Sequence, residues 1–171
     1  MRLGIIISAG ARDNMNHMDI EAAIRKYLPQ MVHLSLATCV DNKPWVSELH
    51  FVYDDSLNLY FRSTKSRRHS QEIAINPFVA GNIVTQHHPG QKVRGVYFEG
   101  QAKRLDSVGE LHPAYLGYCT RFGTGPAILD EARTEGGHIF YQISVSDFYL
   151  FDSYESNPGQ KHHLPWHPRS G

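Results

Sequence analysis

At residues 61–69 the chain reads Phe61-Arg62-Ser63-Thr64-Lys65-Ser66-Arg67-Arg68-His69, and this segment joins two different periodic patterns. Apolar residues alternate from Leu57 to Arg62, which predicts a strand, and a helical pattern follows from Ser66 until Asn76-Pro77 ends it. Hydroxyls and cations therefore gather where a helix begins, and a helix start presents unpaired N–H groups to an anion. On these residues alone two interpretations stay open: a phosphate-binding site, or the solvated first turn of a surface helix.

Strands with alternating apolar residues are predicted on both sides of this junction. Their ranges are 32–40, 45–53, 57–62, 78–85, 93–105 and 139–145, the last with an extension through 148–151. A short amphipathic helix with Asp19 as N-cap precedes them, residues 107–133 are predicted to be helix and loop, and the proline-bearing tail after Phe151 is predicted to be irregular. Mostly antiparallel, meandering strands with helices between them indicate a mainly β (α+β) fold, namely a six-stranded antiparallel split β-barrel with Greek-key order and peripheral helices.

Length and charge limit the classes of protein to which the chain can belong. Its 171 residues, 41% of them apolar, suit one domain with one core. Lysine plus arginine, 17 in total, balances 17 aspartates and glutamates, so no global field is expected to attract nucleic acid or an anionic membrane. No segment reaches the roughly 20 apolar residues of a membrane span. We therefore expect neither nucleic acid nor a membrane as a partner.

The first residues and the two cysteines bear on domain limits and on location. The apolar run after Met1 is too short for a secretory signal, so residues 1–17 are predicted to be an N-terminal extension and residues 18–171 the functional domain. Cys39 and Cys119 match neither a zinc-ligand spacing nor a redox pair. We therefore predict that both cysteines are reduced thiols and that the protein is cytoplasmic.

A set of short motifs in a fixed order extends the argument beyond single residues. Residues 32–105 resemble the pyridoxamine-phosphate-oxidase-like FMN-binding family, and the rest of the chain is weakly similar to an uncharacterised bacterial branch of the same superfamily. The motifs that carry the resemblance are Lys43-Pro44-Trp45, Tyr53-Asp54, Leu59-Tyr60-Phe61, Ser63-Thr64, Arg68-His69, Asn76-Pro77, Arg94-Gly95-Val96 and Phe98-Glu99-Gly100.

This resemblance implies a site for the FMN phosphate at the start of the helix. Ser63, Thr64, Arg68 and His69 would hold the phosphate, with Arg67 and Lys65 as nearby cations. Arginine can bind two phosphate oxygens in parallel and hydroxyls add short hydrogen bonds, so the residue types suit the task.

The resemblance also implies where the flavin ring lies and that the protein is a homodimer. The isoalloxazine would lie along the second strand, where main-chain groups meet its polar edge, and two FMN molecules would sit at the subunit interface. Arg94 would add a cofactor contact, in some relatives across that interface. Trp166 and Arg169 would stand for the C-terminal flavin- and substrate-binding residues of the oxidases, but the intervening sequence does not match. The second-strand residues are Ser47, Glu48, Leu49 and His50.

Two departures bear on the activity. Val52 and Gly95 stand where the oxidases similar to this chain carry a basic residue and a glutamine, which argues against oxidation of pyridoxamine phosphate. We therefore expect an oxidoreductase that passes electrons or hydride between a nicotinamide, NADH or NADPH, and a small acceptor, with the flavin supplying the chemistry. A non-catalytic flavin-binding or stress-related protein, and a split barrel that uses deazaflavin or haem, remain alternatives.

Histidines and isolated glutamates leave further options open. Adjacent histidines on a strand point to opposite faces, so the pairs His87-His88 and His162-His163 predict no metal site, while a tail histidine could be a haem ligand. His50 is equally well explained as a flavin contact or as a core histidine. Glu48 and Glu99 are more simply solvent-facing or cation-paired than acid–base groups.

Overall fold

The computed structural model describes residues 16–154 and 159–167, which form seven strands, four α-helices and one short 3₁₀ helix. None of the helices in these two ranges is long and apolar enough to cross a membrane. In chain order the elements are α1 (His17–Tyr27), η1 (Leu28–Gln30), β1 (His33–Val40), β2 (Lys43–Tyr53), β3 (Leu59–Ser63), α2 (Arg68–Ile75), β4 (Phe78–Val84), β5 (Arg94–Arg104), α3 (Pro113–Phe122), α4 (Ala127–Arg133), β6 (Ile139–Asp152) and β7 (Gln160–Pro165).

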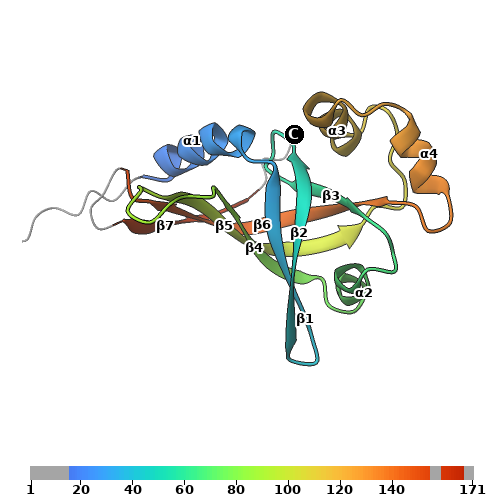
Figure 1. Ribbon diagram of the computed structural model, residues 1–171, viewed down its shortest axis with the longest axis horizontal. Helices are drawn as coiled ribbons and strands as arrows, with labels where there is room; N and C mark the ends of the chain where they lie inside the picture. The colour runs from blue at the N-terminus through green and yellow to red at the C-terminus, as the bar shows by residue number, and fades with distance from the viewer. Residues whose placement is uncertain (1–15, 155–158, 168–171) are drawn as a thin grey trace, which may run out of the picture.

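Six of the strands close into an antiparallel barrel, as the sequence predicts. The sheet order is β3-β2-β1-β4-β5-β6-β7, and an additional β3–β6 pairing closes the ring. Because β4 lies beside β1 rather than beside β3, the order 4-1-2-3 is that of a Greek key. Figure 1 shows α1 above the barrel, α3 and α4 together at one end, and the β1–β2 hairpin projecting beyond the other strands.

Aromatic and aliphatic side chains from every strand of the barrel fill its interior. Phe51, Phe61, Phe98 and Phe148 are at most 1% exposed, and α1 closes the top of this core with Ile24 and its neighbours. Burial of each such side chain stabilises the fold by about 1.5–3 kcal/mol. Packing of these side chains against one another therefore stabilises the closed arrangement of the paired strands.

One glycine allows the Phe98 ring of β5 to pack against the neighbouring strand β4. A Cβ atom on Gly81 of β4 would lie 2.4 Å from the Phe98 ring and 2.4 Å from the Ser35 carbonyl oxygen. Atoms without a bond between them do not approach so closely in packed interiors, so a side chain at this position would displace the ring.

The helix start predicted at Asp19 is wrong by three residues. Asn16 is the N-cap, and its side chain accepts a hydrogen bond of 3.0 Å from the Asp19 N–H. Both residue types cap helices well, so the pattern alone did not rank them. Asp19 lies instead in the first turn, where its negative charge favours the helix dipole.

The prediction of an irregular tail is also wrong for residues 160–165. These residues form β7, which pairs with β6 from Asp147–Pro165 to Asp152–Gln160. Pro165 is tolerated because it ends an edge strand, where its missing N–H costs no ladder hydrogen bond. Pro158, Pro168, Arg169 and residues 1–15 of the predicted extension lie outside the described residues.

Candidate functional site

The barrel opens between β2 and β3. The two strands share only three residue pairs, which end at Phe51–Phe61. Before Phe51, β2 continues in register with β1, while β3 continues along β6 as far as Ser63–Ile139. We call this opening the β2–β3 split, and four of the predicted site residues, Ser47 to His50, lie on its β2 edge.

A histidine from α2 bridges the split. His69 Nδ1 lies 3.0 Å from Ser47 Oγ on β2, and His69 Nε2 lies 2.8 Å from Ser63 Oγ at the end of β3. Each hydroxyl can donate or accept, so a neutral imidazole is satisfied in either tautomer. Burial, and then the charge of Arg67, lower the pKa of His69, which keeps it neutral near pH 7. The structure thus brings Ser47, Ser63 and His69 together, as a bridge.

The start of α2 keeps free donors beside this bridge. Arg67 occupies the N-cap position without a side-chain cap, and the first helical bond runs 3.0 Å from the Gln71 N–H to the Arg67 carbonyl. The amides of the first turn therefore have no intrahelical partner. The hydroxyls of Thr64 and Ser66 lie 3.0 Å apart, and within the described ranges neither Arg67 nor Lys65 forms an ion pair.

Arg68 is already held by other groups at the same helix start. Its Nε donates to Glu72 Oε1 over 2.7 Å, and its guanidinium lies 4.4 Å from the centre of the Trp45 ring on β2. The Thr38 hydroxyl donates to the other Glu72 oxygen, and this bond together with the one from Arg68 lowers the pKa of Glu72. Arg68 thus ties α2 to the hairpin while its charge stays at the helix start.

The outer mouth of the split is a hollow of about 750 Å³. Phe51 donates its N–H to the Val32 carbonyl on the β1 side, so the main-chain groups of the alternate residue His50 point toward the split. The Tyr118 hydroxyl donates to the His50 carbonyl over 3.0 Å. The residues that line the hollow are His33, Glu48, Leu49, His50, Arg62, Tyr118, Glu131 and His138.

The His50 ring lies between two other rings at this mouth. Its centroid is 4.4 Å from that of His33 and 5.2 Å from that of Phe122. Burial, and then the nearby His33, lower the pKa of His50. His50 is therefore neither a buried core residue nor an isolated surface group, but part of the wall of the hollow.

Arg62, which was not among the predicted site residues, lies on the far side of the hollow. Arg62 Nη2 donates to Glu131 Oε2 over 2.6 Å and to the His138 carbonyl over 3.1 Å, and its guanidinium lies over Phe140. Glu131 also accepts from His138 Nδ1 over 2.7 Å. The Arg62 hydrogen bond, and then that of His138, lower the pKa of Glu131 to about 2.

Arg94 and Trp166 lie away from the split in the same chain. Ser63 pairs with the first residue of β6 and Arg94 with the last, and this 14-residue strand spans roughly 40 Å at about 3.3 Å per residue. Arg94 Nε donates to the buried Asp152 over 2.6 Å. Trp166 is in the core, with its Nε1 donating to the Ser56 carbonyl over 3.0 Å.

The described ranges contain no group of three or more His, Cys, Asp or Glu side chains that could hold a metal ion.

The chain is similar in sequence to one known protein family. The model of the family described as pyridoxamine 5'-phosphate oxidase matches residues 20–151. A UPF0306 protein of Photorhabdus laumondii is 28% identical over 140 residues, which are 81% of this chain and 92% of that protein. A UPF0306 protein of Yersinia enterocolitica is 31% identical over 109 residues, 63% of this chain and 74% of that protein.

Solved structures share the fold at low sequence identity. A haem-binding protein from Mycobacterium smegmatis has a TM-score of 0.66 at 16% identity, and the match covers 82% of this chain and 55% of that protein. HutZ, a haem storage protein from Vibrio cholerae, has a TM-score of 0.62 at 20% identity, covering 77% and 93%. An FAD-binding protein from Mesorhizobium loti has a TM-score of 0.54 at 20% identity, covering 76% and 90%. The common element among the three is the barrel.

Proposed function

Because the chain belongs to the pyridoxamine 5'-phosphate oxidase family, we propose that it binds FMN in the β2–β3 split and acts as a flavin-dependent oxidoreductase. The observation that carries this proposal is the placement of an uncapped, cationic helix start next to a strand edge that, among the described residues, lacks a partner strand. The first suits a phosphate monoester and the second suits the polar edge of a flat ring.

The donor set fits the phosphate of FMN. We infer that the phosphate contacts Thr64, Arg67 and the first-turn amides of α2, because in the described part of the chain Arg67 forms no ion pair and the Thr64 hydroxyl contacts only that of Ser66. Ser63 and His69 satisfy each other at the base of the site, so we assign them the role of positioning the helix start. Arg68 adds its charge from the Trp45 side.

The ring would lie along Ser47 to His50 with its substrate-facing side toward the hollow. FMN, when bound, supplies hydride or electron transfer, and the protein supplies binding, orientation and exclusion of water. We propose a nicotinamide, NADH or NADPH, as the donor and a small molecule as the acceptor. Pyridoxamine phosphate is a poor candidate, because Val52 is 2% exposed and a Cβ on Gly117 of α3 would lie 2.9 Å from it, leaving no room there for a basic side chain.

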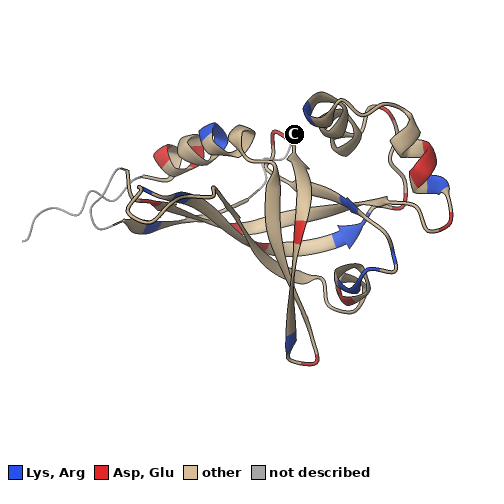
Figure 2. Ribbon diagram, in the orientation of Figure 1, with Lys and Arg blue, Asp and Glu red and all other residues tan. Residues whose placement is uncertain are grey.

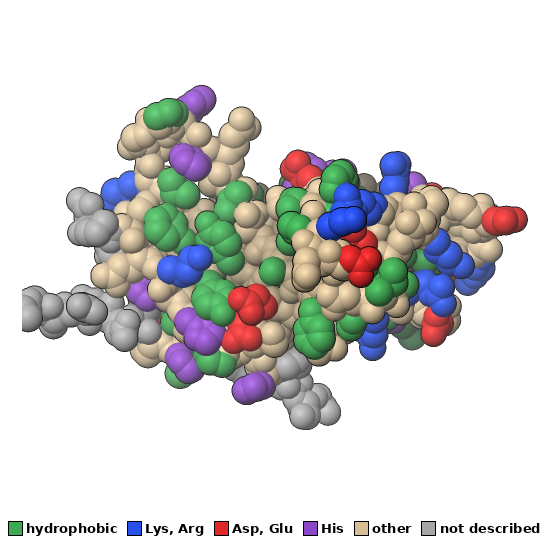
Figure 3. All heavy atoms as spheres, turned by 90° about the horizontal axis from the view of Figure 1, so that it is seen from below, with side chains coloured by type: hydrophobic (Ala, Val, Ile, Leu, Met, Phe, Trp, Pro, Cys, Tyr) green, Lys and Arg blue, Asp and Glu red, His purple; other side chains and the backbone are tan. Residues whose placement is uncertain are grey.

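We further propose a homodimer, which would bring Arg94 of one protomer toward the split of its partner, while Trp166 stays in the core of its own chain. Support comes from exposed apolar residues on the hairpin and β4: Val46 is 61% exposed and Phe78 is 65% exposed. Figure 3 shows hydrophobic side chains spread over the face seen from below, with few charged groups among them on its left side. A cytoplasmic location is part of the same proposal, consistent with free Cys39 and Cys119.

The deciding experiment is the visible absorption spectrum of the purified chain, before and after reconstitution with FMN. A flavin spectrum, with FMN released on heating, is the expected result, and bleaching by NADH or NADPH under anaerobic conditions would establish the oxidoreductase. A bound flavin that neither nicotinamide reduces would leave a flavin-binding protein without this activity. A chain that stays colourless with FMN would overturn the cofactor assignment.

Haem is the second candidate, because three histidines, His33, His50 and His138, line the hollow. The same spectrum separates the two: a Soret band after addition of haemin, lost in the His50→Ala variant, would favour haem. A deazaflavin would be recognised by its own absorption and by mass spectrometry of the released compound.

A further inference from the structure

A second cationic surface lies outside the split, between α2 and α4. It consists of two adjoining pockets of about 540 and 210 Å³ that share Lys65, Arg104 and Asp106, and we call it the α2–α4 trough. Figure 2 shows Lys and Arg on the loop before α2, at the end of β5 and on α4, which border this surface. None of the residues that line the hollow of the split lines the trough.

The trough has more positive than negative charge. Its cations are Lys65, Lys103, Arg104 and Arg133. Arg104 pairs with Asp106 and Arg133 with Asp130, each over 3.1 Å at the exposed surface, where such pairs are weak. Within residues 16–154 and 159–167, Lys65 and Lys103 have no carboxylate partner. Two positive charges are therefore left for a ligand.

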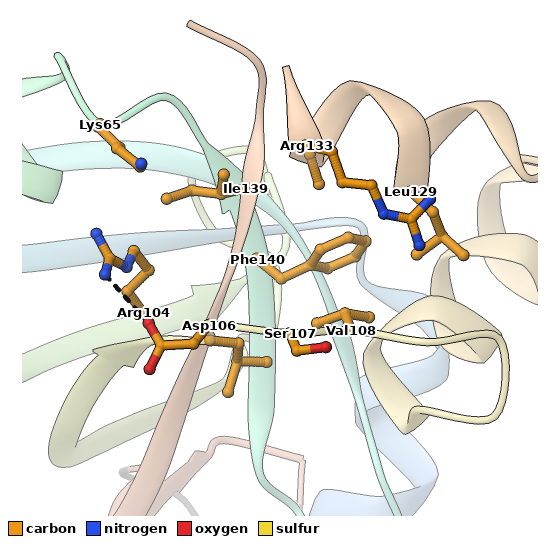
Figure 4. Close-up of a pocket in the computed structure, with 11 residues that line it drawn as sticks. Lys65, Arg104, Asp106, Ser107, Val108, Leu129, Arg133, Ile139 and Phe140 are labelled. Carbon is orange, nitrogen blue, oxygen red and sulfur yellow. Dashed lines mark hydrogen bonds and ion pairs between the residues drawn. The ribbon is translucent and has the colours of Figure 1, made fainter. Parts of the chain in front are cut away.

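Charged and apolar side chains lie in different parts of the trough. In Figure 4, Lys65 and Arg104 lie at one end and Arg133 and Leu129 at the other, with Ile139 and Phe140 between them. The cation end suits an anionic group, and the middle suits an apolar body.

A buried hydroxyl lines the larger pocket of the trough. Ser70 of α2 lines the larger pocket, is 4% exposed, and its Oγ makes no hydrogen bond of good geometry within the described ranges. It lies close enough to the Tyr141 hydroxyl to lower that group's pKa, although burial raises it overall. An unpaired buried hydroxyl is unfavourable, and an oxygen of a ligand would satisfy it.

We propose that the α2–α4 trough binds a phosphorylated small molecule, with its phosphate at Lys65 and Arg104, which line both pockets, and its apolar body toward Leu129 and Ile139. Phosphate oxygens accept from lysine, arginine and hydroxyl donors together, which are the donors present in the trough. The trough and the hollow of the split share no lining residue, although Lys65 also precedes the start of α2.

The test uses the full chain with inorganic pyrophosphate and ADP as probes, followed by calorimetry and by backbone-amide NMR. Both probes are expected to bind and to shift the amides of Arg104 and Val108. The double variant Lys103→Ala/Arg104→Ala is expected to lose about tenfold in ADP affinity, as for removal of charge-assisted contacts, and Ser70→Ala less. Lys26→Ala, an exposed lysine on α1, is the matched control and should bind ADP normally.

The outcomes separate this site from the split. Absence of binding by both probes, or equal losses in Lys26→Ala, would overturn the trough. Amide shifts confined to Thr64 and Arg67 would assign the anion to the start of α2 instead. The double variant changes only β5, so its FMN affinity should equal that of the unmodified chain. If the chain does not bind FMN at all, the loss of ADP affinity in this variant can still be interpreted.

Discussion

The β5–β6 seam and the β2–β3 split close the same barrel by different means. Along the seam, eleven residue pairs run from Arg94–Asp152 to Arg104–Tyr141, with Phe98 and Phe148 paired inside the core. At the split, three pairs give way to a bridge of side chains through His69. The seam uses its main-chain groups internally, whereas the split leaves some of them to side chains such as Tyr118. A ligand site can form at the split because side chains are easier to replace than a ladder.

The largest effect should come from the seam. Phe148→Ala removes a fully buried ring and is expected to lower the free energy of unfolding by about 3–5 kcal/mol, measured by urea denaturation. Leu111→Ala, at an 89% exposed position, is the matched control and should change it by less than about 0.5 kcal/mol. A loss below about 1 kcal/mol in Phe148→Ala would contradict the view that the seam carries the stability of the barrel.

The next effect concerns the ligand at the split. Arg67→Ala and Arg68→Ala should each weaken FMN binding by about 1.5–3 kcal/mol, measured by quenching of flavin fluorescence, because each removes a cation from the helix start. Only Arg68→Ala should also lower the stability of the FMN-free chain, by about 1 kcal/mol, since Glu72 loses a hydrogen bond. Unchanged FMN affinity in both variants would remove the phosphate from α2 while leaving the fold as described.

A smaller effect should appear in the pH dependence of stability. The pKa of His69 is lower in the folded chain than in the unfolded chain, so its contribution is fully present above about pH 6.5 and is lost as the pH falls through the folded pKa. His69→Gln keeps hydrogen-bonding atoms but does not titrate. Stability curves from pH 8 to 5 should therefore fall less steeply in the variant, by at most about 1.4 kcal/mol per pH unit. His50 and His112 titrate in both proteins, and parallel curves would show that the bridge does not resist protonation.

The smallest effect should come from surface charge. Arg133→Ala removes an ion pair with Asp130 whose two side chains are 68% and 75% exposed. The free energy of unfolding should change by less than about 0.5 kcal/mol in urea denaturation. A larger change would mean that α4 is held to the barrel by more than the Arg62–Glu131 contact.

Local patterns were enough to predict the barrel. The strand predicted at 32–40 is observed at His33–Val40, and that at 78–85 is observed at Phe78–Val84, because alternation reports which face of a strand is buried. The seventh strand was missed because two prolines near residues 158 and 165 outweighed a short alternating segment, although Leu164 and Trp166 are buried.

The interior of the candidate site was less accessible to prediction. Sequence order placed Ser63 and His69 together, but their mutual hydrogen bond depends on where α2 packs against the barrel. The contacts of Arg62 with Glu131 and His138 join residues about 70 positions apart, and no local pattern reports such a pairing. Arg62 appeared only as the last residue of a strand.

The His69 bridge also has a consequence for local opening of the folded chain. Where side chains stand in for a ladder, the adjoining amides of β2 should exchange with solvent deuterium sooner than those of β5 and β6, through local opening rather than global unfolding. A ligand held across the bridge would suppress that opening and add to the stability of the whole chain, by about 2.7 kcal/mol at a hundredfold excess over its dissociation constant. Exchange protection at Glu48 and His50 would then report occupancy of the split by any compound, coloured or not.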